Sequence, residues 1–187
     1  RTIFNGILYV LRTGCQWKMM PREYGSGSSG HRHFQAWVRS GVFHELWRLC
    51  LEQYDDLVGI DWQWQRLISH GFGPGKGGDC VGKNPTDRAK LGTKRHVQTD
   101  GNGIPLNASL SGANDHDKTQ LGKLLDRRVV PRPSPRKVRQ PLCLDKGYDY
   151  VDIRRSVARR GYIPHIPYRG EEPAVRKHPG GRAHRWV

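Results

Sequence analysis

The sequence predicts an α/β protein in which a small helical N-terminal segment precedes a mixed sheet. Up to residue 58, apolar residues recur every three or four positions, as they do on the buried face of a helix. From about Asp79 onwards the pattern changes to a hairpin signal and then to alternating helix and strand. We therefore expect two domains, covering residues 1–58 and 59–187.

Three helices are expected in the N-terminal domain. The first covers residues 2–13 and ends before Gly14, a residue type that favours the C-terminus of a helix. The second begins near Ser28 or Ser29, after a loop rich in Gly and Ser. The third covers residues 42–54 and has regularly spaced apolar residues.

The second of these helices is basic on one face. Arg32 and Arg39 lie on that face, whereas Phe34, Trp37 and Val38 form an apolar face. A basic second helix is typical of helix-turn-helix proteins, in which a positive helix enters the major groove. A small helical bundle with solvated charges would have the same pattern, so both interpretations stay open.

The glycine-rich stretch "GFGPGKGG", residues 71–78, resembles a phosphate-binding loop only superficially. A P-loop requires Ser or Thr directly after its Lys, and this sequence has Gly77 there. We expect a flexible loop instead.

The second domain begins its regular structure with a β-hairpin. The turn "DGNG" at residues 100–103 separates an apolar strand from the alternating residues 104–110. A basic, proline-rich connection precedes a short apolar strand later in the chain. The expected order is hairpin, helix, strand, helix and strand, at residues 97–110, 116–129, 142–144, 153–160 and 162–166.

The charge balance indicates a polyanionic partner. Lys and Arg number 32 and Asp and Glu number 17, so the formal net charge is 32 − 17 = +15. Nucleic acid is the usual partner of such a chain, although a basic protein that binds no nucleic acid is the alternative. No apolar run approaches the ~18 residues of a membrane span, and no signal peptide is visible. We expect a soluble intracellular protein without membrane contact.

Metal-binding patterns are weak in this sequence. The four cysteines form no C-x-x-C pair, so neither a zinc site nor a disulfide framework is indicated. His116 lies between Asp115 and Asp117, but the two carboxylates precede a helix and are interpreted as N-terminal caps. His31 and His33 lack other ligands nearby, and we expect no metal there.

Asp145 is the candidate for chemistry. It follows the apolar run 142–144, and the carboxyl end of a buried strand is where open α/β sheets place their functional groups. The alternative is that Asp145 caps the turn into the next helix. Phosphoryl transfer with two divalent ions requires carboxylates from separate strands, so Asp145 could supply one ligand but could not hold two ions alone.

Four stretches together resemble the bacterial insertion-sequence transposases of the DDE class. They are "FNGILYVLRTGCQWKMMPREYGSGSS", "NPTDRAKLGTKRHVQTDGNGIPL", "GANDHD" and "LDKGYD", and they cover nearly the whole chain in the family's order. The resemblance implies a ribonuclease-H-like catalytic fold, Mg²⁺ as cofactor, and the cutting and rejoining of DNA at element ends. It also implies a bacterial cytoplasmic, nucleoid-associated protein whose partners are terminal inverted repeats and target DNA, and which forms a homo-oligomer on DNA. Asp145 matches the family's second catalytic and metal-binding Asp.

The resemblance fails at the other two catalytic carboxylates. Relatives carry the first Asp on a strand after "DWQWQ", and a gapless count places Ile68 at that position. Asp61 and Asp79 are nearby but displaced along the chain. The third residue, a Glu, belongs to a helix that relatives begin just beyond Val187. The chain also starts without Met, so we expect a truncated, degenerate copy whose catalytic domain lacks its C-terminal end.

Three functional interpretations follow. The first is a protein of insertion-sequence DNA transposition that is catalytically incomplete by itself. The second is a DNA-binding remnant without catalysis, and the third is a basic RNA-binding module. We expect DNA contacts from five basic residues: Arg32, Arg39, Lys94, Arg95 and Lys146.

Overall fold

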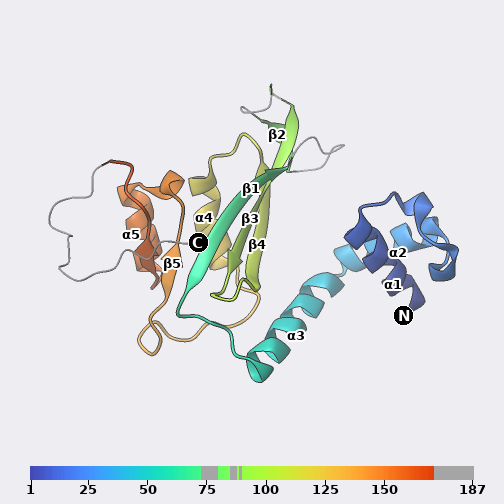
Figure 1. Ribbon diagram of the computed structural model, residues 1–187, viewed down its shortest axis with the longest axis horizontal. Helices are drawn as coiled ribbons and strands as arrows, with labels where there is room; N and C mark the ends of the chain where they lie inside the picture. The colour runs from blue at the N-terminus through green and yellow to red at the C-terminus, as the bar shows by residue number, and fades with distance from the viewer. Residues whose placement is uncertain (73–79, 85–87, 89, 171–187) are drawn as a thin grey trace. The chain divides into compact units, whose positions relative to one another are not determined.

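The computed structural model describes residues 1–72, 80–84, 88 and 90–170 (Figure 1). The chain divides into two compact units, Arg1–Leu57 and Val58–Val187, which are described separately below. Among the described residues, no helix has both the length and the apolar character needed to cross a membrane.

The first unit is helical. Gly14 adopts a left-handed conformation (φ 69°) that ends the first helix, as the sequence predicted. The second helix begins slightly earlier than predicted, because Ser26 rather than Ser28 or Ser29 caps it; the Ser26 hydroxyl accepts from the backbone N–H of Ser29 at 3.2 Å. The elements are α1 (Thr2–Thr13), η1 (Trp17–Met19), η2 (Arg22–Tyr24), α2 (Gly27–Arg39) and α3 (Val42–Leu57).

Aromatic side chains hold this helical unit together. The Phe34 ring lies 5.3 Å from that of Trp17 and 5.5 Å from that of Phe43, measured between centroids. Trp37 contacts Phe4 from the adjacent helix at 6.1 Å. The apolar face that the sequence assigned to the second helix is therefore the face that packs against its neighbours.

The second unit is a mixed sheet with two helices. Its hairpin, its short apolar strand and its two helices lie where the sequence placed them, within a few residues. The elements are β1 (Gln65–Phe72), β2 (Gly82–Lys83), β3 (Leu91–Thr99), β4 (Pro105–Gly112), α4 (Asp117–Asp126), β5 (Pro141–Cys143), η3 (Lys146–Tyr148), α5 (Val151–Arg159) and β6 (Ile163–His165).

The strand order defines the fold. β3 pairs antiparallel with both β1 and β4, while β5 pairs parallel with β1 and β6 pairs parallel with β5. The short β2 pairs with the start of β3. Three antiparallel strands in sequence, followed by two parallel strands joined through helices, give the order β4-β3-β1-β5-β6 of a ribonuclease-H-like sheet (Figure 1). The predicted α/β fold class is confirmed.

The core of this unit lies between one face of the sheet and the two helices. β1 contributes Leu67 and β5 contributes the fully buried Leu142. The helices add apolar residues at helical spacing: Leu121, Leu124 and Leu125 from α4, and Ile153 and Val157 from α5. Side chains alternate along a strand, so the residues between the core positions face the other side of the sheet.

β1 is the element that local sequence patterns predicted least well. Its sequence, "QRLISHGF", is largely polar, yet the strand lies between β3 and β5 in the sheet. The glycine-rich loop that we interpreted as flexible begins within this strand, because Gly71 and Phe72 still pair with β3. Its remaining residues, 73–78, lie outside the described residues, so that interpretation stays a prediction.

The hairpin turn is organised by a buried carboxylate. Asp100 is fully buried, and its Oδ1 accepts from the backbone N–H groups of Asn102 at 2.9 Å and Ile104 at 2.8 Å. Its Oδ2 accepts from the backbone N–H of Asp61 at 3.2 Å, which ties the segment entering β1 to the hairpin.

Replacing Asp100 is expected to destabilise this unit. Asp100→Ala removes the acceptor of three backbone donors, and we expect a loss of about 3 kcal/mol in the free energy of unfolding, measured by urea denaturation. Asn102→Ala in the same turn, where the side chain is exposed, is the matched control and should cost less than about 0.5 kcal/mol. Equal losses for the two variants would contradict the role of the carboxylate.

Candidate active site

Asp145 lies two residues beyond β5, at the strand end where the sequence placed it. Its side chain is exposed rather than buried. Its Oδ1 accepts from the backbone N–H of Gly147 at 2.6 Å and so caps η3. Asp145 therefore both follows the strand end and caps the turn, as the two interpretations of the sequence proposed. Its second carboxylate oxygen has no hydrogen bond to the described residues.

The register of the parallel pair β1–β5 points to a position on β1 opposite Asp145. In the parallel pair, Gln65 is the partner of Leu142 and Arg66 is the partner of Cys143. The parallel pairing ends there, and continuing its register by two residues on each segment brings Ile68 opposite Asp145. Residues paired in this way face the same side of the sheet, which is the side away from α4 and α5. Ile68 is 54% exposed there, so its apolar side chain occupies the surface next to the carboxylate.

The two other acidic residues near β1 do not join this site. Asp61 lies at the opposite end of β1, where its backbone N–H donates to Asp100 and its Oδ1 accepts from Gln63 N–H at 3.0 Å. Asp79 lies outside the described residues. Among the described side chains, Asp145 is therefore the carboxylate beside position 68.

A hydrogen-bonded series of polar side chains runs beneath the candidate site. The Ser69 hydroxyl lies 2.9 Å from the Tyr148 hydroxyl and 2.8 Å from Nδ1 of His96. Nε2 of His96 lies 2.9 Å from the Ser111 hydroxyl, which is 3.3 Å from the carbonyl oxygen of Gly112. His96 and Tyr148 are each 1% exposed. Burial lowers the pKa of His96 and raises the pKa of Tyr148, which favours the neutral form of each group.

Lys94 joins β3 to the start of α4. Its ammonium group donates to the backbone carbonyl of Asp115 at 2.8 Å and to Oδ1 of Asp117 at 3.0 Å. The predicted contact between Lys94 and a DNA phosphate would thus compete with an ion pair inside the protein. The α4 cap is His116 rather than either Asp, because its Nδ1 accepts from Lys118 N–H at 3.3 Å.

The other predicted DNA contacts are exposed. Arg95 projects from the same face of the sheet as Ile68, and Lys146 directly follows Asp145. In the helical unit, Arg32 and Arg39 are exposed on α2 and lie seven residues apart, which places them on one face of that helix.

Sequence reasoning missed Arg169 at the turn after Asp145. Its guanidinium donates to the carbonyl oxygens of Lys146 at 3.1 Å and Gly147 at 2.7 Å, and it lies 4.4 Å from the centre of the Tyr150 ring. Arg169 is distant from this turn in sequence, so no local pattern could have indicated the contact.

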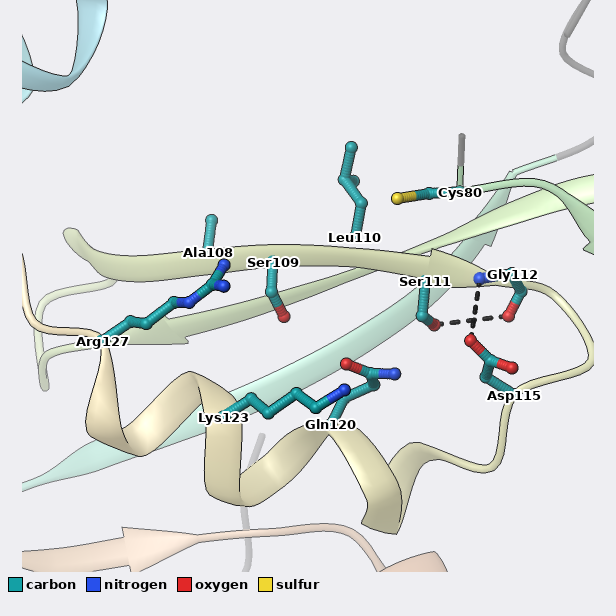
Figure 2. Close-up of a pocket in the computed structure, with 10 residues that line it drawn as sticks. All are labelled: Cys80, Ala108, Ser109, Leu110, Ser111, Gly112, Asp115, Gln120, Lys123 and Arg127. Atoms are coloured by element: carbon teal, nitrogen blue, oxygen red, sulfur yellow. Dashed lines mark hydrogen bonds between the residues drawn. The ribbon is translucent and has the colours of Figure 1, made fainter. Parts of the chain in front are cut away.

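A groove of about 550 Å³ between β4 and α4 was also not anticipated (Figure 2). Lys123 of α4 and Arg127, which follows α4, line one side, and Ser109 and Ser111 lie on the strand opposite. Lys123 lies on the last turn of α4, and Arg127 is the extended residue directly after the helix. The helix was predicted, but these two cations were not singled out.

The donor atoms of this site do not fit a pair of magnesium ions. Such a pair needs several carboxylate or carbonyl oxygens converging from separate strands, and Ile68 supplies none. Among the described residues, no group of three or more His, Cys, Asp or Glu side chains is arranged to hold a metal ion. Asp145 could contribute one ligand at most.

Comparison with known proteins identifies the family. Residues 55–184 match the model described as "Transposase DDE domain", and residues 1–47 match the model described as "Putative transposase of IS4/5 family". The chain belongs to the DDE transposases.

Individual relatives agree with this assignment. The chain is 42% identical over 112 residues to the "Putative transposase for insertion sequence element IS402" of Burkholderia cepacia, a match covering 57% of this chain and 50% of the relative. It is 31% identical over 87 residues to the "Insertion element IS402 uncharacterized 16.2 kDa protein" of the same organism, covering 46% and 59%. The chain therefore spans about half the length of the curated relatives it matches.

One solved structure is also similar. It is the piggyBac transposase synaptic complex with hairpin DNA, at 16% identity and a TM-score of 0.41, covering 65% of this chain and 27% of that chain.

Proposed function

We propose that this chain acts in DNA transposition of an insertion sequence, as a DNA-binding protein that does not catalyse strand cleavage by itself. What supports the proposal is that the register of β1 and β5, continued beyond Cys143, brings the exposed Ile68 opposite Asp145 on a ribonuclease-H-like sheet. By the family resemblance, these two positions would carry the first and second catalytic Asp, and the first is replaced here by an apolar side chain.

We propose a separate role for each of the two units of the chain. The helical unit, residues 1–58 in the domain prediction, would contact DNA through the basic face of α2 that carries Arg32 and Arg39. The sheet unit, residues 59–187, would be a partial DDE domain in which Arg95 and Lys146 contact phosphates beside Asp145. Mg²⁺ is the ion that Asp145 would bind in a site completed by further carboxylates.

The proposed partners are the inverted repeats at the element ends and the target DNA, bound by a homo-oligomer of the chain. The charge of +15 supports a polyanionic partner. An RNA-binding module is less well supported, because Trp17 and Trp37 pack against other aromatic rings of the helical unit instead of forming an open platform for bases.

Selection of bound sequences tests this function. Duplexes selected by the purified chain from a random pool are expected to share a motif that recurs, inverted, at the two ends of the element carrying the gene. The selected duplex should bind at least about tenfold more tightly than a scrambled duplex of the same composition. Equal binding to scrambled DNA, or tighter binding to single-stranded RNA, would contradict the proposal.

A further inference from the structure

The polar side chains beneath the candidate site form a chain of hydrogen bonds with a single direction. We propose that this chain, Tyr148–Ser69–His96–Ser111–Gly112, holds the turn bearing Asp145 against β1 beside position 68, and that His96 is its positioning residue in the Nε2–H tautomer. The inference rests on the proposed function only in treating Asp145 as a functional residue. The direction of the hydrogen bonds in this series is inferred from the hydrogen bonds themselves and does not depend on the proposed function.

The direction is set at the Gly112 end (Figure 2). A carbonyl oxygen can only accept, so in the contact between Ser111 and Gly112 the Ser111 hydroxyl is the donor. In the proposed direction the Ser111 oxygen accepts from His96, whose Nε2 carries the proton. Because a neutral imidazole has one N–H, Nδ1 of His96 is an acceptor and takes the hydrogen of Ser69.

The Tyr148 hydroxyl completes the series. The Ser69 hydroxyl has used its hydrogen on His96, so its oxygen accepts from Tyr148 at 2.9 Å. With this direction, each of the three hydroxyls and the imidazole N–H has an acceptor, and the buried Tyr148 hydroxyl donates to Ser69 on β1.

The opposite direction leaves one hydroxyl without an acceptor. If Nδ1 of His96 carried the proton, it would donate to Ser69, and the single contact between Ser69 and Tyr148 could use the hydrogen of only one of these two hydroxyls. The other hydroxyl hydrogen would then have no acceptor among the hydrogen bonds of the described residues. A charged imidazole also leaves one hydroxyl without an acceptor, because its Nδ1 donates to Ser69. The charged groups around the ring are Lys94, which lies on the same strand, and Asp115 and Asp117 at the start of α4.

The hydrogen-bonded series lies where it can hold the turn that carries Asp145. Tyr148 is the last residue of η3, the turn that Asp145 caps, and Ser69 immediately follows Ile68 on β1. The Tyr148–Ser69 bond therefore joins the segments that carry the two positions paired across the sheet. The same bond lies on the helix-covered face, so it can hold the turn without occupying the exposed face where Asp145 lies.

The first test is the tautomer of His96. A long-range ¹H–¹⁵N correlation spectrum of the whole chain, with the His96 signals assigned by their loss in His96→Gln, is expected to show protonated Nε2 and unprotonated Nδ1. A protonated Nδ1, alone or in a mixture, would overturn the direction of the chain.

The second test is the effect of Tyr148→Phe on the turn. This variant keeps the ring and removes the donor, so the Gly147 amide that donates to Asp145 should exchange with solvent at least about tenfold faster. Tyr150→Phe is the matched control, because it removes a hydroxyl from the same turn that contacts His116 rather than β1. Equal exchange at Gly147 in the two variants would overturn the positioning role.

A third measurement separates positioning from general stability. In a chain carrying Ile68→Asp, adding Tyr148→Phe is expected to weaken Mn²⁺ binding at least about fivefold, whereas Tyr150→Phe leaves it unchanged. Equal Mn²⁺ affinity for the Tyr148→Phe and Tyr150→Phe chains would count against the proposal. DNA enters none of these measurements, so a failure of the proposed function would be seen in the sequence-selection experiment and not here.

Discussion

Ile68→Asp is expected to create a divalent-cation site that the unchanged chain lacks. The register of β1 and β5, continued beyond Cys143, brings position 68 opposite Asp145 on the same side of the sheet, so a second carboxylate there would bring oxygen ligands from two segments together. We expect Mn²⁺, titrated by electron paramagnetic resonance, to bind at least about tenfold more tightly than to the unchanged chain, a change of about 1.4 kcal/mol.

Two matched variants identify the source of this gain. Ile68→Asn has nearly the same shape as Ile68→Asp without the charge, and it should give less than half of the gain in binding free energy. Ile68→Asp combined with Asp145→Asn should lose most of the gain, because one carboxylate leaves the ion mostly hydrated. An affinity that does not depend on Asp145 would show that the register does not bring the two positions together.

Strand cleavage should follow the same pattern. The unchanged chain is expected not to cut a plasmid carrying matched element ends in Mg²⁺ or Mn²⁺, because loss of a positioned ion costs several powers of ten in rate. Ile68→Asp, in a chain that also carries the Glu-bearing helix implied by the family resemblance, is expected to cleave the plasmid. Cleavage by the unchanged chain that vanishes in Asp145→Ala would contradict this prediction and would indicate Asp61 or Asp79 as the partner.

The second large effect concerns salt. With a net charge of +15, the chain is expected to bind duplex DNA through many phosphate contacts, each of which releases counterions. If 6–10 phosphates are neutralised, affinity should fall by roughly 10³–10⁵ between about 50 and 200 mM salt, as measured by fluorescence anisotropy. Binding that is insensitive to salt over this range would contradict a phosphate-dominated interface.

Single-residue variants assign this salt dependence to α2. Arg32→Ala and Arg39→Ala should each reduce the slope of log affinity against log salt by about 1. Arg48→Ala is the matched control: it removes the same charge from α3, where the guanidinium is paired with Glu45 and Glu52. An equal loss of slope in Arg48→Ala would mean that net charge, and not the α2 surface, controls binding.

Elements defined by local signals could be predicted from the sequence. α1 lies at its predicted residues and ends at Gly14, and the hairpin turns at residues 100–103, because a glycine cap and an Asp-Gly turn act on their immediate neighbours. The strand end at Asp145 followed from an equally local apolar run.

β1 could not be predicted from local pattern for a specific physical reason. Its apolar Ile68 faces outward and its polar Ser69 faces the helix-covered side, which is the reverse of the usual alternation. Ser69 is satisfied there by His96 and Tyr148, which are 27 and 79 residues away in sequence. Contacts of this range leave no periodic signal, so the pairing of position 68 with Asp145 required the sheet itself.

The two faces of β1 also determine which changes in chain length the site can tolerate. Ser69 is fixed to His96 on one face and residue 68 lies beside Asp145 on the other, while the Asp61–Asp100 contact holds the start of the segment. A one-residue insertion or deletion between these anchors would exchange the faces, whereas a change of two residues would preserve them. An insertion or deletion of two residues within β1 therefore keeps the residues on their present faces of the sheet, whereas an insertion or deletion of one residue does not.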